Sequence, residues 1–348
     1  MPARTRVLVC EDSKTFAAGL VRTLERGGEI EVVGVAVTAE AAIADLTRLA
    51  PDLVTMDLEL PGMSGLEAVE EIMSTRPTPI LIVSSHLRAG SDLAAAALAS
   101  GALEAIGKSD LVLLDPDGPA AVAFRRRIKL LSGARVIRHP RGRLNGRNGA
   151  LRARPPCGAV IGICASTGGP HALATLLAGI PTDFAVPILV VQHIGSGFSV
   201  GLAEWLDAAV PLPVRLAEHG ARSALPGVSL APDGADLLLG PDGVLQLDRT
   251  TPAGLHRPSG DALLRSIAYH AQSAGVAVVL TGMGRDGADG LAAVRDAGGL
   301  TIAQDEATSA VYGMSREAAK RGAALILPIG EIARALTTVA LESRAPAR

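Results

Sequence analysis

Five polar residues in the first 110 positions have the types expected of a site that accepts a phosphoryl group. Glu11, Asp12 and Asp57 carry carboxylates, Ser84 carries a hydroxyl, and Lys108 carries an ammonium group. Three carboxylates gathered at one edge need a cation, and a site made only of oxygen ligands favours Mg²⁺. An aspartate beside that ion can act as a nucleophile toward phosphorus. We therefore predict a phosphoacceptor site with a bound Mg²⁺.

The elements predicted around these residues explain why they would meet. Short apolar runs precede all five, and they lie at residues 6–10, 30–35, 53–56, 80–83 and 103–106. Stretches of helical length separate the runs, which predicts a parallel sheet covered by helices on both faces. In such doubly wound sheets the ligand site lies at the carboxyl ends of the strands. A single acid at a strand end could simply be solvated. Three acids, a serine and a lysine at four strand ends together indicate a site.

A second set of residues, in the C-terminal half, could form the triad of a serine hydrolase. Ser166, His193 and Asp286 each follow an apolar run. The three runs span residues 158–164, 187–192 and 276–280. A nucleophilic serine needs a base, and the base needs an acid that orients it. Because the ends of parallel strands converge, we predict that these three side chains meet.

The backbone around these residues offers donors for the negative charge that forms on an attacked carbonyl. Met283 lies between Gly282 and Gly284, so its amide can come close to a substrate and is a candidate oxyanion donor. The amide of Thr167, directly after the serine, is a second candidate.

Each member of the triad has an alternative interpretation. Ser166 could cap a helix or lie in a phosphate-binding glycine turn, and Asp286 could cap the helix that follows it. Asp289 and Asp305 are rivals for the acid. Cys164 is a conceivable nucleophile, although alternation along its strand predicts a small buried residue. The half holds four further histidines, of which none closes a clear strand: His171, His219, His256 and His270.

Charge divides the chain into three parts. The 348 residues have a net charge of −2, yet residues 125–154 hold 11 basic residues and no acidic one. We predict one domain over residues 1–124, a basic flexible linker over 125–156 and a second domain over 157–348. The linker could be a hinge between acidic domains, or an arm that binds nucleic acid or an anionic membrane.

Composition narrows the class of protein. With 48% hydrophobic and 20% charged residues the chain has a globular composition. Three cysteines without a CxxC pair predict neither a disulfide framework nor a zinc site, and they favour a reducing compartment. The first residues do not resemble a signal peptide, and no run of eighteen apolar residues occurs, so we expect a cytoplasmic protein. Aromatic residues make up 2%, which argues against a surface that stacks single-stranded bases.

Residues 1–124 resemble a response-regulator receiver domain, the phosphoacceptor of two-component signalling. The stretch at 56–67, MDLELPGMSGLE, is close to the phosphorylation loop of that family. The resemblance implies a flavodoxin-like fold, a histidine kinase as phosphodonor, and phosphorylation of Asp57. It further implies that Glu11 and Asp12 help Asp57 to hold Mg²⁺ and that Ser84 and Lys108 contact the phosphoryl group.

This stretch also departs from the receiver pattern. Ser109 replaces the proline that usually follows the lysine, and Ala105 replaces the switch aromatic. Ser64 stands where an aspartate is common. Phosphoryl transfer should tolerate these changes, whereas the route from phosphate to output is less secure.

The C-terminal part, from about Gly158 to Leu341, resembles the catalytic domain of the CheB family, the chemotaxis protein-glutamate methylesterases. The resemblance rests on five segments, ASTGGP at 165–170, QH at 192–193, APDG at 231–234, HRPS at 256–259 and LTGMG at 280–284. It implies a mostly parallel α/β hydrolytic domain with Ser166, His193 and Asp286 as nucleophile, base and acid.

The same resemblance implies the reaction. Its substrates would be glutamate γ-methyl esters of chemoreceptors and, in some members, receptor glutamines that are deamidated. The ester step needs no cofactor, and phosphorylation of the receiver would activate it. Arg285, where asparagine is common, should help to keep Asp286 ionised. Two alternatives remain: a phosphorylation-controlled nucleic-acid binder that uses the basic linker, and a degenerate esterase that only binds receptors.

Overall fold

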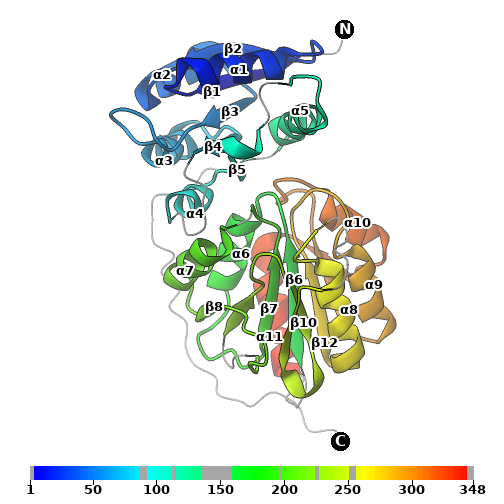
Figure 1. Ribbon diagram of the computed structural model, residues 1–348. Coiled ribbons are helices and arrows are strands. Elements are labelled where there is room, and N and C mark those ends of the chain that lie inside the picture. The colour runs from blue at the N-terminus through cyan, green and yellow to red at the C-terminus, as the bar shows by residue number, and fades with distance from the viewer. Residues whose placement is uncertain are drawn as a thin grey trace, which may run out of the picture. The chain divides into compact units, whose positions relative to one another are not determined.

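A computed structural model of the chain describes residues 4–85, 92–111, 115–134, 136, 159–195, 197–223, 227–250 and 256–342. It divides into two compact units, residues 1–142 and 143–348 (Figure 1). Each unit is built around a parallel sheet with helices on both faces, so the predicted α/β class with two doubly wound domains is confirmed.

The N-terminal unit has a five-stranded parallel sheet in the order β2-β1-β3-β4-β5. The strands are β1 (Thr5–Cys10), β2 (Ile30–Ala36), β3 (Leu53–Met56), β4 (Ile80–Ser84) and β5 (Glu104–Gly107). The helices are α1 (Lys14–Glu25), α2 (Ala39–Leu49), α3 (Gly65–Thr75), α4 (Asp92–Ala99) and α5 (Pro119–Ser132). The middle strands β3 and β4 are buried throughout, because helices cover both sides of the sheet.

Polar caps fix where several of these helices begin. Ser13, Thr38 and Ser64 are the N-caps of α1, α2 and α3, and each side chain accepts a hydrogen bond from a backbone amide in the first turn. Ser64 also forms a capping box with Glu67, so the serine found in place of aspartate has a local structural role.

Helix α5 spans the predicted boundary at residue 124, so the basic block begins within a helix. Helix α5 continues to Ser132, and Phe124, Ile128 and Leu131 are buried on one of its faces at helical spacing. The basic residues Arg126 and Lys129 lie on the exposed side of the same helix. Most of the remaining linker prediction, residues 137–156, lies outside the described residues.

The C-terminal unit has a seven-stranded parallel sheet in the order β14-β13-β12-β6-β7-β9-β8. The strands are β6 (Val160–Ala165), β7 (Ile188–Gln192), β8 (Val214–Leu216), β9 (Val228–Leu230), β12 (Gly275–Val279), β13 (Leu300–Gln304) and β14 (Leu325–Leu327). Two further strands, β10 (Asp236–Leu239) and β11 (Leu245–Asp248), form a separate antiparallel hairpin.

Six helices complete this unit among the described residues. They are α6 (Gly169–Ala178), α7 (Ser199–Ala209), α8 (Gly260–Ala271), α9 (Ala288–Asp296), α10 (Met314–Lys320) and α11 (Ile329–Glu342). Alternate residues of the central strand β6 point to opposite faces of the sheet. Ile161 and Ile163 pack in the core with α6, α7 and α11, whereas Val160 and Cys164 pack with α8, α9 and the hairpin. Figure 1 shows α8 and α9 side by side on their face of the sheet.

Among the described residues, no helix combines the length and apolar character needed to cross a membrane.

Candidate functional site

The sheet of the N-terminal unit brings the predicted phosphoacceptor residues to one edge. Pairing of β1 with β3 places Cys10 beside Met56, so the residues that follow, Glu11 and Asp57, are neighbours. The ammonium group of Lys108 lies 2.8 Å from Glu11 Oε1 and 2.7 Å from Asp57 Oδ2. Ser84, at the end of β4, pairs with Gly107, the residue before Lys108. Glu11, Asp57 and Ser84 are buried, whereas Asp12 is exposed.

Burial and pairing act in opposite directions at this edge. Burial raises the pKa of Glu11, and the hydrogen bond from Lys108 offsets only part of that rise. Burial alone would lower the pKa of Lys108, but its hydrogen bonds to Asp57 and Glu11 outweigh burial, so that pKa is raised. The lysine is therefore held as a cation between two carboxylates.

Three carboxylates at this edge are close enough to share a metal ion. One oxygen from each of Glu11, Asp12 and Asp57 lies within 4.8 Å of the others. A donor set made only of oxygens suits Mg²⁺. Two of the three departures from the receiver pattern lie near this site: Ser109 is in a one-turn 3₁₀ helix after β5, and Ala105 is half-buried within β5.

In the C-terminal unit the structure joins His193 to Asp286. His193 Nε2 lies 2.8 Å from Asp286 Oδ2, and both side chains are about nine-tenths buried. The other ring nitrogen, Nδ1, is buried and has no hydrogen-bond partner in the described part of the chain. Nδ1 is therefore the nitrogen available to a serine hydroxyl.

Ser166 lies at the end of the neighbouring strand. The His193 amide donates to the carbonyl of Ala165, the residue before the serine, at 2.9 Å. The side chain of Gln192 donates to the carbonyls of both Ser166 and His193, each at 2.8 Å, and so links the two strand ends. Within the described ranges the Ser166 hydroxyl is not bonded to His193, since Nε2 bonds to Asp286 and Nδ1 has no partner.

A sharp turn presents Ser166. Its amide donates to the carbonyl of Thr281 at 3.0 Å, and its carbonyl accepts from the amide of Gly169 at 2.7 Å. Gly168 has a φ of +72°, and a Cβ there would lie 2.6 Å from the Cβ of Ala310. The turn therefore requires glycine at this position. Gly168, and not Ser166, is the N-cap of α6, so the interpretation of Ser166 as a helix cap was wrong.

Asp286 is held by the first turn of α8. Ser259 Oγ and the Asp261 amide donate to Oδ1 at 3.1 and 3.0 Å, and the Gly260 amide donates to Oδ2 at 2.6 Å. Burial alone would raise the pKa of Asp286. The hydrogen bond from His193 and those from the two helix amides outweigh burial and lower this pKa to about 2. The carboxylate thus stays ionised and does not cap α9, whose N-cap is Gly287.

The prediction that Arg285 helps to keep Asp286 ionised was wrong. The side chain of Arg285 is exposed, and the groups that lower the pKa of Asp286 are His193 and the amides of α8. The helix N-terminus supplies the positive potential that was attributed to the arginine.

The rival residues have other partners. Asp289 lies 2.8 Å from Arg321 NH2, and Asp305 Oδ1 accepts hydrogen bonds from the amide and hydroxyl of Thr308. Cys164 is fully buried, and burial raises the pKa of its thiol well above the ordinary value. These surroundings disfavour both acids as partners of His193 and the thiol as a nucleophile.

The loop that carries Met283 runs beside the turn that carries Ser166 and Thr167. A Cβ added at Gly282, the residue before Met283, would lie 2.6 Å from the Ser166 Cβ, so this loop runs directly past the serine. Gly284, after Met283, has a φ of +84°. The Thr167 carbonyl accepts a hydrogen bond from Thr281 Oγ1 at 2.9 Å, which ties the serine turn to the same loop.

Comparison with known proteins assigns the family. Residues 161–336 match the family model of the CheB methylesterase domain, and residues 7–112 match that of the response regulator receiver domain. A protein of Anaeromyxobacter dehalogenans named protein-glutamate methylesterase/protein-glutamine glutaminase 2 is 44% identical over 336 residues, which cover 95% of this chain and 96% of that protein. The chain belongs to the CheB methylesterase family.

Two further comparisons agree with this family membership. A protein of Geobacter metallireducens named protein-glutamate methylesterase/protein-glutamine glutaminase 4 is 40% identical to this CheB-family chain and covers 97% of it. The crystal structure of the Thermotoga maritima CheB methylesterase catalytic domain has a TM-score of 0.51 and 36% sequence identity. The match covers 52% of this chain and 98% of the Thermotoga domain.

Sequence reasoning missed several residues of the site in this CheB-family chain. Ser259 lies in the HRPS segment of the family resemblance, but the sequence did not predict that its hydroxyl donates to Asp286. His256, from the same segment, stacks on His193 with ring centroids 4.4 Å apart. Gln192 was part of the QH segment but was given no role; it ends the apolar strand β7 and bonds to the carbonyls of Ser166 and His193. For Ser259 the available signal was a serine followed by a helical pattern, which predicts an N-cap but not the acid that it also contacts.

Proposed function

We propose that this protein is a protein-glutamate methylesterase whose activity is controlled by phosphorylation of Asp57. The observation that carries the proposal is the His193–Asp286 hydrogen bond of 2.8 Å at the strand end beside Ser166. A base that is oriented by an ionised acid, next to a half-buried serine in a sharp turn, is the arrangement of acyl transfer.

The first half of the proposed reaction forms an acyl-enzyme. Ser166 Oγ attacks the ester carbonyl of a glutamate γ-methyl ester while His193 Nδ1 accepts the hydroxyl proton. Asp286 stabilises the imidazolium that results. The amides of Met283 and Thr167 would hold the oxyanion. The intermediate collapses when His193 gives its proton to the methoxide, and methanol leaves.

The second half restores the enzyme. Water enters, and His193 Nδ1 takes one of its protons as the water oxygen attacks the acyl carbonyl. Collapse of this second intermediate returns the proton to Ser166 Oγ and releases the glutamate side chain. The same route would convert a glutamine side chain to glutamate with ammonia as the leaving group. This second activity appears in the names of the relatives.

The receiver unit would control this reaction. Glu11, Asp12 and Asp57 would hold Mg²⁺, which neutralises charge on an incoming phosphoryl group. Asp57 would accept the phosphoryl group from a histidine kinase, and Lys108 and Ser84 would contact it. The single positive charge of Lys108 already lies between Glu11 and Asp57, which supports its role as a phosphoryl contact.

We propose chemoreceptors as the substrates, the cytoplasm as the location, and the segment between α5 and β6 as the linker of the two domains.

Methanol release from methylated chemoreceptor membranes tests the proposal. Wild type should release methanol faster when Mg²⁺ and a small phosphodonor are present, and Ser166→Ala should release none. Cys164→Ala is the matched control, because it removes the rival nucleophile two residues away and should retain activity.

The outcomes separate the parts of the proposal. Release that ignores the phosphodonor, and that Asp57→Asn does not change, contradicts the regulatory half alone. Release that Ser166→Ala retains contradicts the assigned nucleophile. An absence of release from wild type contradicts the esterase, and salt-dependent DNA binding would then support the nucleic-acid alternative. The basic stretch on which that alternative depends lies mostly outside the described residues.

A further inference from the structure

A buried carboxylate outside the triad is tied to the segment that holds Asp286. Asp236 is the first residue of β10 and is 8% exposed. Its Oδ1 accepts a hydrogen bond from the Ser259 amide at 2.8 Å, and its Oδ2 accepts one from Arg257 Nε at 3.2 Å. One carboxylate therefore bonds to both ends of the three-residue segment Arg257–Ser259.

This segment carries the donors that hold the catalytic acid. Ser259 is the N-cap of α8 and accepts a hydrogen bond from the Ala262 amide at 3.3 Å. Its hydroxyl donates to Asp286, as do the amides of the next two residues. Three of the four hydrogen bonds to Asp286 thus come from a short stretch whose start is fixed by Asp236; the fourth comes from His193.

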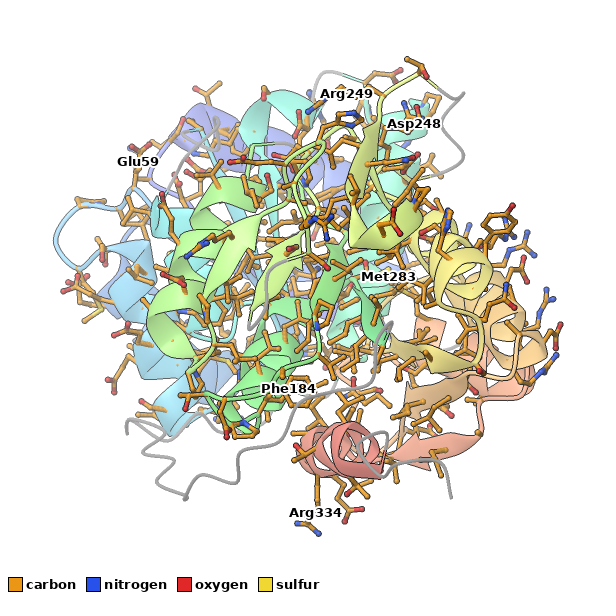
Figure 2. The ribbon with its side chains drawn as sticks, turned by 90° about the horizontal axis from the view of Figure 1, so that it is seen from below. Glu59, Phe184, Asp248, Arg249, Met283 and Arg334 are labelled. Atoms are coloured by element: carbon orange, nitrogen blue, oxygen red, sulfur yellow. The ribbon has the colours of Figure 1, made fainter. Side chains whose placement is uncertain are left out.

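The β10–β11 hairpin holds Asp236 in place. Asp236 pairs with Asp248 of β11, and Figure 2 shows Asp248 and Arg249 together at the end of that strand. The Arg249 carbonyl accepts a second hydrogen bond from Arg257, at 3.0 Å from NH1. The hairpin residues Leu237, Leu239 and Leu245 are buried in the core that α8 also enters.

From this chain of contacts we infer that Asp236 is a positioning residue for the proposed ester hydrolysis. Asp236 sets the place of Ser259, Ser259 and the following amides set the place of Asp286, and Asp286 orients His193. In the described part of the chain the hydrogen bonds of the Asp236 carboxylate join it to Arg257 and Ser259 and not to the triad. The inference rests on the proposed function for its kinetic consequence, but the orientation of His193 can be observed without any turnover.

The test compares variants of the full chain that differ in what they remove. Asp236→Ala removes both acceptors, whereas Asp236→Asn keeps an oxygen for the Ser259 amide and loses the charge that faces Arg257. Asp207→Asn is the matched control, because Asp207 also accepts a backbone amide, that of Val214 at 2.7 Å, but lies on α7 and contacts no residue of this network.

Two readouts follow the effect. The first is kcat and KM for methanol release from methylated chemoreceptor membranes. The second is the downfield ¹H signal of the His193 imidazole N–H that bonds to Asp286. We expect Asp236→Ala to lower kcat by about tenfold or more with KM changed by about twofold or less, since misplaced catalytic groups cost rate. The imidazole signal should shift or disappear. Asp236→Asn should retain part of both, and Asp207→Asn should match wild type.

A double variant tests whether Asp236 acts through Ser259. If it does, the loss of kcat in the double variant Asp236→Ala, Ser259→Ala should be smaller than the product of the two single losses, because Asp236→Ala already displaces the hydroxyl that Ser259→Ala removes. Full additivity of the two losses would contradict the inference.

The remaining outcomes also decide the matter. An unchanged imidazole signal in Asp236→Ala would overturn the inference, as would a loss of kcat no larger than that of Asp207→Asn. If Asp236→Ala does not fold, Asp236→Asn with the same two readouts decides. If wild type releases no methanol, the proposed function fails, and the imidazole signal still shows whether Asp236 orients His193.

Discussion

Replacement of Asp286 by asparagine tests the arrangement of the triad most directly. Each carboxylate oxygen accepts two hydrogen bonds: Oδ1 from Ser259 and the Asp261 amide, Oδ2 from His193 and the Gly260 amide. Asparagine has one acceptor oxygen and one NH₂ group that only donates. Whichever way the asparagine amide turns, its NH₂ group faces two hydrogen-bond donors, either those of Ser259 and Asp261 or those of His193 and Gly260. His193 would then lose its orientation, or the start of α8 would lose its acceptor.

The expected loss of rate is large. The change removes the charge that stabilises the imidazolium and favours the wrong tautomer of His193. In serine hydrolases the equivalent change lowers kcat by about 10⁴-fold. That factor corresponds to about 5 kcal/mol of barrier. We therefore expect kcat of Asp286→Asn to fall by about 10³- to 10⁴-fold, while KM changes little because the acid does not touch substrate.

The same change has a pH-dependent effect on stability. The pKa of Asp286 is lowered from 3.8 to about 2 in the folded protein. The ionised carboxylate therefore stabilises the fold fully above the ordinary pKa, and this stabilisation is lost as the pH falls through about 2. At about 1.4 kcal/mol per tenfold change in proton affinity, it amounts to about 2 kcal/mol. The side chain is 10% exposed, so solvent screening reduces the figure little.

Methanol release at saturating substrate and denaturant unfolding of the C-terminal unit measure the two effects. The stability difference between wild type and Asp286→Asn should be constant from pH 7 to 5 and should shrink to about half by pH 3. Asp289→Asn is the control, since Asp289 lies three residues away but pairs with Arg321. A kcat of Asp286→Asn within tenfold of wild type would refute the role of this acid. A stability difference that grows as the pH falls would refute the origin assigned to the lowered pKa.

Three other changes test separate parts of the structure. Gly168→Ala places a side chain at a φ of +72° and against Ala310, so it should destabilise the C-terminal unit by about 1–3 kcal/mol and lower kcat; thermal unfolding with native-like stability would contradict the strained turn. Ser64→Ala removes the capping box with Glu67 and should lower the free energy of unfolding of the N-terminal unit by about 1 kcal/mol, as measured by denaturant unfolding. The rate of Asp57 phosphorylation should not change. Lys108→Met removes the cation between two buried carboxylates, so the rate of Asp57 phosphorylation by a small phosphodonor should fall, as followed by the phosphoprotein formed; an unchanged rate would show that the lysine does not contact the phosphoryl group.

Local pattern sufficed for most of the fold. The strand predicted at residues 53–56 matches β3, and the four other predicted strands of the first domain lie within one residue of β1, β2, β4 and β5. Buried parallel strands are short, continuous and apolar, so they are distinct in a sequence. The charge pattern alone could not predict where α5 ends, because this helix carries basic residues opposite the buried Ile128 and Leu131.

By itself, the sequence determined which residues could do chemistry and which strand ends would carry them. Strand ends in a parallel sheet are fixed by the apolar runs, and so the neighbourhood of Ser166 and His193 could be predicted. Only the tertiary structure decided which acid meets His193. Asp286 was one of three candidates in sequence. It is distinguished by the first turn of α8, which lies some 25 residues earlier in the chain.

The tertiary structure also decided what supports that acid. The donors to Asp286 come from the start of a helix, and the position of that start depends on Arg257 and Asp236, which belong to a loop and a hairpin outside the main sheet. The periodicity of a sequence reports which side of an element faces the core. It carries no information on which loop reaches which carboxylate, because such contacts depend on how separate elements pack in three dimensions.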